Sequence, residues 1–259
     1  MPYEYREFKD DILKYTGIDL NSYKEEQMKR RIDSLILRKS YIDYKNYFRL
    51  ISEDSAVCDE FLGYMTINVS EFFRNPDQWR ILETDFLPDL ISRCKGNINI
   101  WSAACSTGDE PYSLVMLLSR YLPLEKIKVF ATDIDAQILA KAKVGLYSAS
   151  SIQNVPSDLR QRYFIDCGMG TYQLSKSVID RVVFCQHNLL ADEYPKNMDL
   201  IVCRNVLIYF TEEAKNEVYR KFYDSMNHKS VLFIGTTEQV IRYREIGFSI
   251  YKSFFYKKG

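Results

Sequence analysis

The segment at residues 98–113, INIWSAACSTGDEPYS, constrains the fold most, because an apolar run passes through a polar turn into a helical pattern. Gly108 ends the turn, and Pro111 falls in the first turn of the following helix, where a missing N–H group costs nothing. A second apolar run, at residues 127–132, ends in Asp133. This order of strand, turn, helix, strand and carboxylate is typical of an α/β protein that binds a nucleotide-type ligand at the edge of its sheet.

The turn is a poor match to the G-x-G-x-x-G loop of dinucleotide-binding proteins, because Gly108 is its single glycine. Glu110, at the start of the helix, would also repel a pyrophosphate. A cofactor with a ribose, no phosphates and a positive charge suits Glu110 and Asp133 better, and S-adenosylmethionine has these properties. Similar units occur in α/β proteins that bind nothing there, so this segment alone leaves cofactor binding and a structural role equally open.

The composition indicates a globular protein and argues against several function classes. The 259 residues are 46% apolar, and 35 basic residues balance 35 acidic ones, so no overall field attracts nucleic acid. The charged N-terminal sequence MPYEYREFKDD lacks the apolar core of a signal peptide, and no apolar run reaches membrane-spanning length, which predicts a cytoplasmic protein. The six cysteines include no C-x-x-C pair and the chain has two histidines, so we expect reduced thiols and no metal site.

The first part of the chain is predicted to be helical, and the rest to alternate strands with helices in an α/β fold. The expected helices of the first part cover residues 4–16, 24–39, 41–52 and 54–67, with a longer helix near 76–93. The expected strands cover residues 97–103, 127–132, 181–185, 198–203 and 230–235, with an aromatic strand at 248–258. Helices at residues 110–121, 135–143 and 211–225 separate most of them. This order predicts a doubly wound parallel sheet that ends in an antiparallel pair.

The domain boundaries follow from this change of pattern. Residues 1–70 are predicted to form a helical N-terminal domain, residues 71–95 a linker and leading helix, and residues 96–259 the α/β domain. Residues 146–180 break the alternation, and an insertion of this length is usually functional. We expect a small antiparallel β-subdomain there that contains YFIDCG and TYQLS. It is either a packing element or lid, or a surface that docks a partner.

A second group of polar residues follows the apolar strand at residues 200–203, in the sequence DLIVCRNVLIYF. Ligands in open α/β sheets bind at the carboxyl ends of strands, so Asn205 and Tyr209, beside Arg204, are candidate site residues. The alternative role for Asn205 is to cap a helix. Adenine-directed nucleic-acid methyltransferases carry an Asn/Asp-Pro-Pro-aromatic motif here. Val206 follows Asn205 in this chain, which disfavours base methylation.

Four motifs together resemble those of the CheR family of chemoreceptor glutamate methyltransferases, over almost the full length of the chain. They are TINVSEFFRNP at 66–76, WSAACSTGDEPYS at 101–113, ATDID at 131–135 and CRNVLIYF at 203–210. The resemblance implies a small all-helical N-terminal domain followed by a doubly wound, mostly parallel, seven-stranded S-adenosylmethionine-dependent methyltransferase domain with a small antiparallel β-subdomain insertion. It also implies methylation of glutamate side-chain carboxylates on the cytoplasmic helical region of chemoreceptors, for chemotactic adaptation, with S-adenosyl-L-homocysteine as the second product.

The resemblance also implies the roles of the site residues. Arg74 and Tyr209 are implied to be catalytic. The implied cofactor-binding residues are Asn68, Ser70, Arg74, Ala104, Gly108, Glu110, Asp133, Ile134, Asn188, Leu189, Asn205 and Val206. Among these, Glu110 takes the methionyl end, Asp133 holds the ribose, and the pairs at 188–189 and 205–206 line the adenine side. The family often has Thr at position 70 and Glu at position 109, where this chain has Ser and Asp, and both changes keep the chemistry.

The reaction makes modest demands on such a site. A free glutamate titrates near pH ~4.3, so the nucleophile is already ionised and no strong general base is needed. The site has to orient the acceptor and exclude water. We expect Arg74 to hold the acceptor carboxylate through its fork of donors and Tyr209 to fix the other oxygen. The alternative for Arg74 alone, without the motif, is a surface ion pair.

The predicted helix at residues 24–40 carries six basic and three acidic residues, an excess of three positive charges (6 − 3) in a neutral chain. Such a face is usually just solvated. Given the resemblance, we expect it to steer the acidic coiled coil of methyl-accepting chemotaxis receptors. The residues predicted to bind this partner are Lys29, Arg30, Arg31 and Arg38, and reversing Arg30 and Arg31 to Glu is expected to raise the Michaelis constant for receptor.

The remaining expectations are a monomer that binds no nucleic acid and reaches the membrane only through receptors. Two other functions stay open at this point. One is a sensor or scaffold that binds S-adenosylmethionine without turnover. The other is a methyltransferase that acts on a different acceptor.

Overall fold

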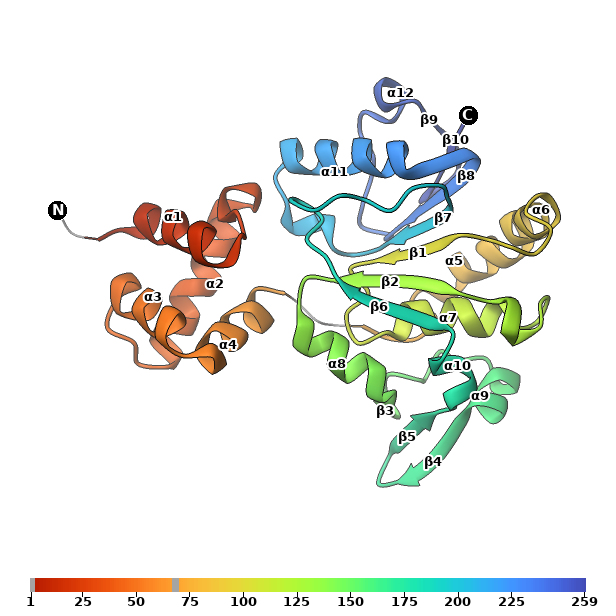
Figure 1. The fold of residues 1–259 in the computed structure, drawn as a ribbon, viewed down its shortest axis with the longest axis horizontal. Helices are drawn as coiled ribbons and strands as arrows, with labels where there is room; N and C mark the ends of the chain where they lie inside the picture. The colour runs from red at the N-terminus through yellow and green to blue at the C-terminus, as the bar shows by residue number, and fades with distance from the viewer. Residues whose placement is uncertain (1–2, 67–69) are drawn as a thin grey trace.

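The computed structural model describes residues 3–66 and 70–259, and Figure 1 shows a helical domain beside a larger α/β domain. Within residues 3–66 the chain forms α1 (Tyr5–Thr16), the 3₁₀ turn η1 (Leu20–Ser22), α2 (Glu25–Arg38), α3 (Tyr44–Glu53) and α4 (Ser55–Met65). Asp43 and Asp54 begin α3 and α4, since each carboxylate accepts a backbone N–H group of the first turn at 2.8 Å. The predicted helical domain is confirmed for these residues, and the expected end of its last helix, residue 67, lies outside them.

A broken helix leads into the second domain. It consists of α5 (Pro76–Ile81), the π-helical turn η2 (Leu82–Phe86) and α6 (Leu87–Arg93). The prediction of one regular helix near 76–93 missed the π turn. Pro88 has no N–H group for the preceding turn, and the N–H group of Leu87 bonds to the carbonyl of Leu82, five residues earlier.

The described part of the second domain contains a seven-stranded sheet in the order β6-β2-β1-β7-β8-β10-β9. Its strands are β1 (Ile100–Ala103), β2 (Val129–Asp133), β6 (Val182–Gln186), β7 (Met198–Cys203), β8 (Met226–Ile234), β9 (Phe248–Lys252) and β10 (Phe255–Lys258). The first five strands of this order run parallel, and β10 and β9 are antiparallel to their neighbours. Helices α7 (Asp109–Leu118) and α8 (Ala136–Val144) cover one face and α11 (Glu212–Ser225) covers the other (Figure 1). The predicted doubly wound, mostly parallel sheet is confirmed.

The end of the sheet differs in detail from the prediction. The single aromatic strand expected at 248–258 is two strands, β9 and β10, because the chain reverses at Ser253 and Phe254, where Phe254 has φ 70°. The predicted strand at 230–235 starts four residues earlier, at Met226. Both strands of the hairpin carry aromatic side chains, so the sequence pattern did not mark the turn between them.

The insertion between β2 and β6 contains a separate three-stranded antiparallel sheet in the order β3-β5-β4. Its elements are β3 (Leu146–Ser148), α9 (Ser157–Tyr163), β4 (Phe164–Gly168), β5 (Thr171–Leu174) and α10 (Lys176–Ile179). The predicted β-subdomain insertion is confirmed. Elsewhere in the second domain are η3 (Leu124–Lys126), η4 (Leu207–Tyr209) and α12 (Tyr243–Ile246). Of the helices in residues 3–66 and 70–259, none has the length and apolar character needed to span a membrane.

Candidate active site

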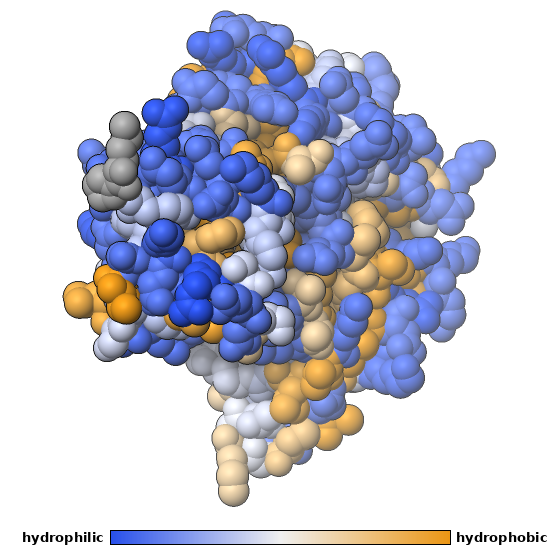
Figure 2. All heavy atoms as spheres, turned by 60° about the vertical axis from the view of Figure 1, so that its left-hand side comes forward, coloured by the Kyte–Doolittle hydropathy of each residue, from blue (hydrophilic) through white to orange (hydrophobic). Residues whose placement is uncertain are grey.

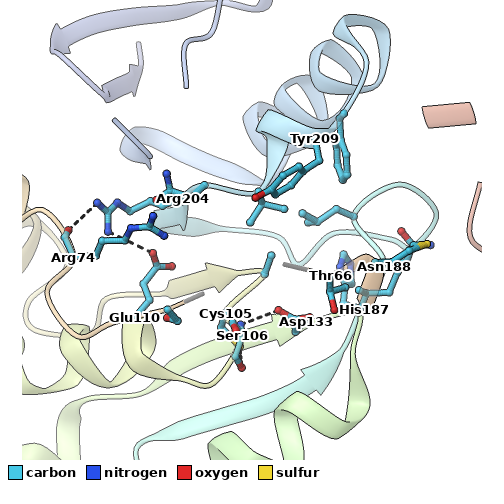
Figure 3. A pocket seen from close by; sticks show the side chains of 18 of the residues that line it. Thr66, Arg74, Cys105, Ser106, Glu110, Asp133, His187, Asn188, Arg204 and Tyr209 are labelled. Carbon is cyan, nitrogen blue, oxygen red and sulfur yellow. Dashed lines mark hydrogen bonds and ion pairs between the residues drawn. The ribbon is translucent and has the colours of Figure 1, made fainter. Parts of the chain in front are cut away.

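A cavity lies at the carboxyl ends of β1, β2, β6 and β7, where residues of the helical domain also face it. Figure 3 shows Arg74 and Glu110 at one end, Asp133 in the middle and Asn188 at the other end, with Tyr209 on the opposite wall. The predicted site residues that line this cavity are Ser70, Arg74, Ala104, Glu110, Asp133, Ile134, Asn188, Leu189, Asn205, Val206 and Tyr209. Their assigned roles remain predictions. Asn68 lies outside the described residues.

Gly108 is the predicted cofactor-binding residue that the structure does not bring to the cavity wall. It has φ 87° and precedes α7. A Cβ atom at this position would lie 2.9 Å from the ring of Tyr112, so glycine is required by both the backbone conformation and the packing. Its N–H group donates to the carbonyl of Cys105 at 3.0 Å and closes the turn. Gly108 therefore shapes the turn whose other residues face the cavity.

Three non-glycine residues with positive φ line the cavity. Ala104 (φ 59°) and Ser106 (φ 50°) follow β1, and Asn205 (φ 61°) follows β7. Such conformations are costly and persist where the surrounding structure requires them, often at functional sites. Here they let the chain turn away at the sheet edge, where the N–H group of Ser106 donates to Asp133 and that of Asn205 donates to Glu238. The sequence gives no signal for Ala104, since alanine has no special preference for this conformation.

Asp133 is almost fully buried at the end of β2, as the sequence predicted. Its Oδ2 atom accepts the N–H group of Ser106 at 2.8 Å, and its Oδ1 atom accepts that of Asp135 at 3.1 Å. Burial raises the pKa of Asp133 to about 6, although both backbone hydrogen bonds lower it. The two hydrogen bonds fix the direction of the carboxylate, and burial disfavours its negative charge. A ligand that donates further hydrogen bonds to it would stabilise that charge.

Glu110 lies in the first turn of α7 at the other end of the cavity, where its side chain is 13% exposed. Its Oε1 atom accepts the hydroxyl of Ser102 at 2.8 Å, and its Oε2 atom lies 4.0 Å from Nη1 of Arg204. Burial raises the pKa of Glu110 to about 7, and the charge of Arg204 is the largest opposing cause. A bound cation near Glu110 would favour its ionised form.

The sequence placed Arg204 at the end of a strand, but it did not show that this side chain binds the segment that carries Arg74. Its Nη2 atom donates to the carbonyl of Arg74 and to Oδ1 of Asn75, both at 2.9 Å. The guanidinium lies 4.7 Å from the ring centre of Phe233, and burial lowers its pKa from the usual value. Arg204 therefore ties the segment that carries Arg74 to the end of β7 (Figure 3).

Ser70 and Asp109 form a second link between that segment and α7. Burial raises the pKa of Asp109 to about 6, while hydrogen bonds from the side chains of Thr107 and Ser70 lower it. Ser70 therefore lines the cavity and also contacts the start of α7. A hydroxyl at position 70 is enough for this contact, so threonine would preserve it.

Glu238 is the clearest residue that sequence reasoning missed. Its buried carboxylate accepts four backbone N–H groups, from Asn205 (2.8 Å), Val206 (3.0 Å), Leu207 (2.9 Å) and Gly235 (2.7 Å). It thereby holds together the loops that follow β7 and β8. Three of the four contacts span more than thirty residues of sequence, and the signal in the sequence is an acidic residue shortly after a strand end.

Tyr209 faces the cavity from η4 (Figure 3). Burial raises the pKa of Tyr209 above its usual value, while the positive charges of Arg31 and Arg74 lower it. Its hydroxyl therefore stays protonated at neutral pH and acts as a donor. The carbonyl of Tyr209 accepts the N–H group of Lys24 at 2.9 Å, which joins η4 to the segment before α2.

The predicted partner-binding residues on α2 differ in their surroundings. Arg30 and Arg38 are exposed. Lys29 pairs with an aspartate one turn later at 2.8 Å. Arg31 is half-buried, donates to the carbonyl of Tyr64 and lies 4.8 Å from the centre of its ring. Figure 2 shows that much of the surface on this side of the molecule is hydrophilic. Arg30 and Arg38 represent a basic docking face better than Arg31, because both are exposed and Arg31 is half-buried.

Two family models together cover almost the whole chain. The model described as "CheR methyltransferase, all-alpha domain" matches residues 3–66, and the one described as "CheR methyltransferase, SAM binding domain" matches residues 68–253. The chain belongs to the CheR methyltransferase family. It is therefore an S-adenosylmethionine-dependent methyltransferase, and the predicted family, enzyme class and cofactor are confirmed.

Curated relatives agree with this assignment. The chemotaxis protein methyltransferases of Listeria innocua serovar 6a and Listeria monocytogenes serovar 1/2a are each 42% identical over 255 residues, which covers 98% of this chain and 97% of each relative. The chemotaxis protein methyltransferase of Escherichia coli K12 is 32% identical over 244 residues, covering 90% of this chain and 83% of the relative. The enzyme acts in chemotaxis.

Cofactor affinity is expected to depend on pH through Glu110 and Asp133, whose pKa values are about 7 and about 6. A cationic ligand favours the ionised carboxylates, so affinity for S-adenosylmethionine should fall as pH drops through 7, by up to about tenfold per pH unit. Calorimetry at pH 8, 7 and 6 would measure this. Glu110→Gln should flatten the change near pH 7, and equal dissociation constants at pH 8 and pH 6 in the unmodified enzyme would contradict the expectation.

The same raised pKa has the opposite consequence for the unliganded fold. Between pH 4.5, the ordinary pKa of a glutamate, and about pH 7, Glu110 is protonated in the folded state but ionised in the unfolded chain. Stability from this group is therefore fully present below pH 4.5 and is lost as pH rises through 7. Cofactor affinity and the stability of the unliganded enzyme are expected to respond to Glu110 with opposite signs.

Proposed function

We propose that the cavity binds S-adenosylmethionine with the ribose at Asp133 and the methionyl end at Glu110, and that the methyl group passes to receptor glutamates. The observation that carries the proposal is that Arg74, Tyr209, Glu110 and Asp133 line one cavity although they come from four separate segments. The residues fit the cofactor chemically. The carboxylates of Glu110 and Asp133 match a cation that also carries ribose hydroxyls. No group of His, Cys, Asp or Glu side chains suited to a metal occurs among residues 3–66 and 70–259.

The reaction proposed is a displacement at the methyl group. When bound, S-adenosylmethionine would supply a methyl group attached to a positively charged sulfonium sulfur. The leaving group is the uncharged thioether of S-adenosyl-L-homocysteine. Arg74 holds one side of the acceptor carboxylate, and Tyr209 donates a hydrogen bond to the other oxygen. No proton has to be removed, because the glutamate is already ionised at neutral pH. The contribution of the enzyme is orientation and exclusion of water, which can be worth about 7–11 kcal/mol in favourable cases.

The proposed partner is the cytoplasmic coiled coil of methyl-accepting chemotaxis receptors, approached by a monomeric enzyme in the cytoplasm. Arg30 and Arg38 on α2 offer positive charge to its glutamate-rich faces. The segment 22–24, just before α2, is hydrogen-bonded to residues 209–211. A receptor helix that binds α2 would therefore lie near the wall of the cavity that carries Tyr209. Nucleic acid is not expected to bind, and the membrane is approached only through receptors.

Reversal of charge on α2 tests the docking face. Arg30→Glu with Arg38→Glu is expected to raise the apparent Michaelis constant for receptor about three- to tenfold and to weaken its salt dependence, with cofactor affinity unchanged. We prefer Arg38 to Arg31 because Arg31 also binds the carbonyl of Tyr64. Lys45→Glu with Arg49→Glu on α3 is the matched control. Equal Michaelis constants for the two double variants at low and high salt would eliminate α2 as a docking face.

Transfer of labelled methyl groups tests the function as a whole. The enzyme would be offered labelled S-adenosylmethionine with receptor cytoplasmic fragments, with fragments whose methylation-site glutamates are changed to alanine, with nucleic acid, or with no acceptor. The expected result is a base-labile protein ester that forms only on the intact fragments. Cofactor binding without transfer would favour a sensor, and label in nucleic acid alone would favour another acceptor.

A further inference from the structure

The helical domain contributes to the cavity through a short strand-like contact. Residues 22–24, which run from the last residue of η1 to the residue before α2, lie antiparallel to residues 209–211, with Tyr23 opposite Phe210. The N–H group of Lys24 donates to the carbonyl of Tyr209 at 2.9 Å, and that of Thr211 donates to the carbonyl of Ser22 at 2.9 Å. These two backbone hydrogen bonds, one on each side of Tyr23, fix its position relative to the catalytic domain.

The side chain of Tyr23 is fixed as well. Its ring meets that of Phe210 edge to face, with centroids 5.0 Å apart at 83°. Tyr23 lines the same cavity as Asp133 and Glu110. Within residues 3–66 and 70–259, no side chain or backbone group forms a hydrogen bond with its hydroxyl. The cavity therefore holds a positioned phenol whose hydrogen-bonding capacity the described residues do not use.

The electrostatics of Tyr23 favour a donor. Burial raises the pKa of its hydroxyl well above the usual value, and the negative charges of Asp133 and Asp19 raise it further. The phenol is neutral at neutral pH, and its proton is available. Tyr23 and Asp133 both line the cavity, so a ligand held by Asp133 would share that cavity with this hydroxyl.

We propose that Tyr23 is a further cofactor-binding residue, supplied by the helical domain, whose hydroxyl hydrogen-bonds the nucleoside part of S-adenosylmethionine beside Asp133. The proposal rests on the cofactor placement given under Proposed function. An unused polar group in a binding cavity is most simply explained by the ligand that completes it. The segment that carries Tyr23 leads directly into α2, so the nucleoside would contact both domains at once.

The test is the affinity for S-adenosyl-L-homocysteine, measured by calorimetry on the full-length enzyme. Tyr23→Phe keeps the ring contact with Phe210 and removes only the hydroxyl, and it is expected to raise the dissociation constant about three- to tenfold. Tyr15→Phe is the matched control, since that half-exposed tyrosine lies in the same domain outside the cavity. It should bind as the unmodified enzyme does. Melting temperatures would establish that each variant is folded.

Asp133→Asn separates failure of this proposal from failure of the cofactor placement. If Asp133→Asn weakens binding while Tyr23→Phe binds normally, Tyr23 has only a structural role and the proposal is wrong. If neither change affects binding, the nucleoside does not lie at Asp133, and the placement fails together with the proposal. If Tyr23→Phe and Tyr15→Phe weaken binding equally, the effect is not specific to the cavity and the proposal is also overturned.

Discussion

Arg74→Ala is expected to lower turnover about 100-fold or more at saturating cofactor and receptor, while the affinity for S-adenosyl-L-homocysteine changes much less. The reason is that a group that orients the acceptor carboxylate acts most strongly in the transition state. Arg74 lies at the cavity end that also holds Glu110 and Arg204, whose charges fix the local field (Figure 3). Single-turnover methylation of receptor fragments would measure the chemical step.

The variants of Arg74 have matched controls. Arg74→Lys keeps the charge and loses the fork of donors, so it should recover only part of the rate. Arg80→Ala removes an exposed arginine from α5 that pairs with Asp77 at the surface, and this variant should turn over normally. Tyr209→Phe should lower the rate without changing cofactor affinity by more than a few-fold. Turnover at the unmodified rate in both Arg74→Ala and Tyr209→Phe would remove both residues from catalysis.

The parts of the fold that the sequence predicted are those set by local chemistry. Apolar spacing and the turn signals of Gly108 and Pro111 act within a few residues, so they located the helices of the first domain and the turn before α7. Asp133 was found for the same reason, because it directly follows a strand. The rule that ligands bind at the carboxyl ends of parallel strands then gathered the separate motifs at one edge.

The features that were missed depend on contacts between distant segments. Tyr23 meets Phe210, and Glu238 meets Asn205, only after the fold has formed. Arg31 looked like another member of a basic face, yet its guanidinium turns inward to the carbonyl of Tyr64. A charge pattern in the sequence predicts a basic helix face, but it does not show which of the basic side chains bond to other parts of the protein. The π turn was missed because a proline near a helix interior predicts a disturbance without specifying its form.

Glu238→Ala is expected to lower the free energy of unfolding by about 3–5 kcal/mol, because four buried or half-buried N–H groups lose one shared carboxylate. The carboxylate packs closely against Gly235, where a Cβ atom would lie 2.6 Å from Oε2 of Glu238. Asn205 and Val206 both line the cavity. Loss of cofactor affinity should therefore accompany the loss of stability.

Glu238→Gln is expected to cause a smaller loss of stability than Glu238→Ala. Its amide oxygen can still accept from two of the four N–H groups, while its NH₂ group faces the other two, so a smaller loss of about 1–3 kcal/mol is expected. Glu245→Gln in α12 is the control, because Glu245 is exposed and lies 3.9 Å from Arg242 in a surface ion pair. Urea unfolding would rank the three variants. If Glu238→Gln is as stable as Glu245→Gln and binds cofactor equally well, the carboxylate does not organise this edge of the site.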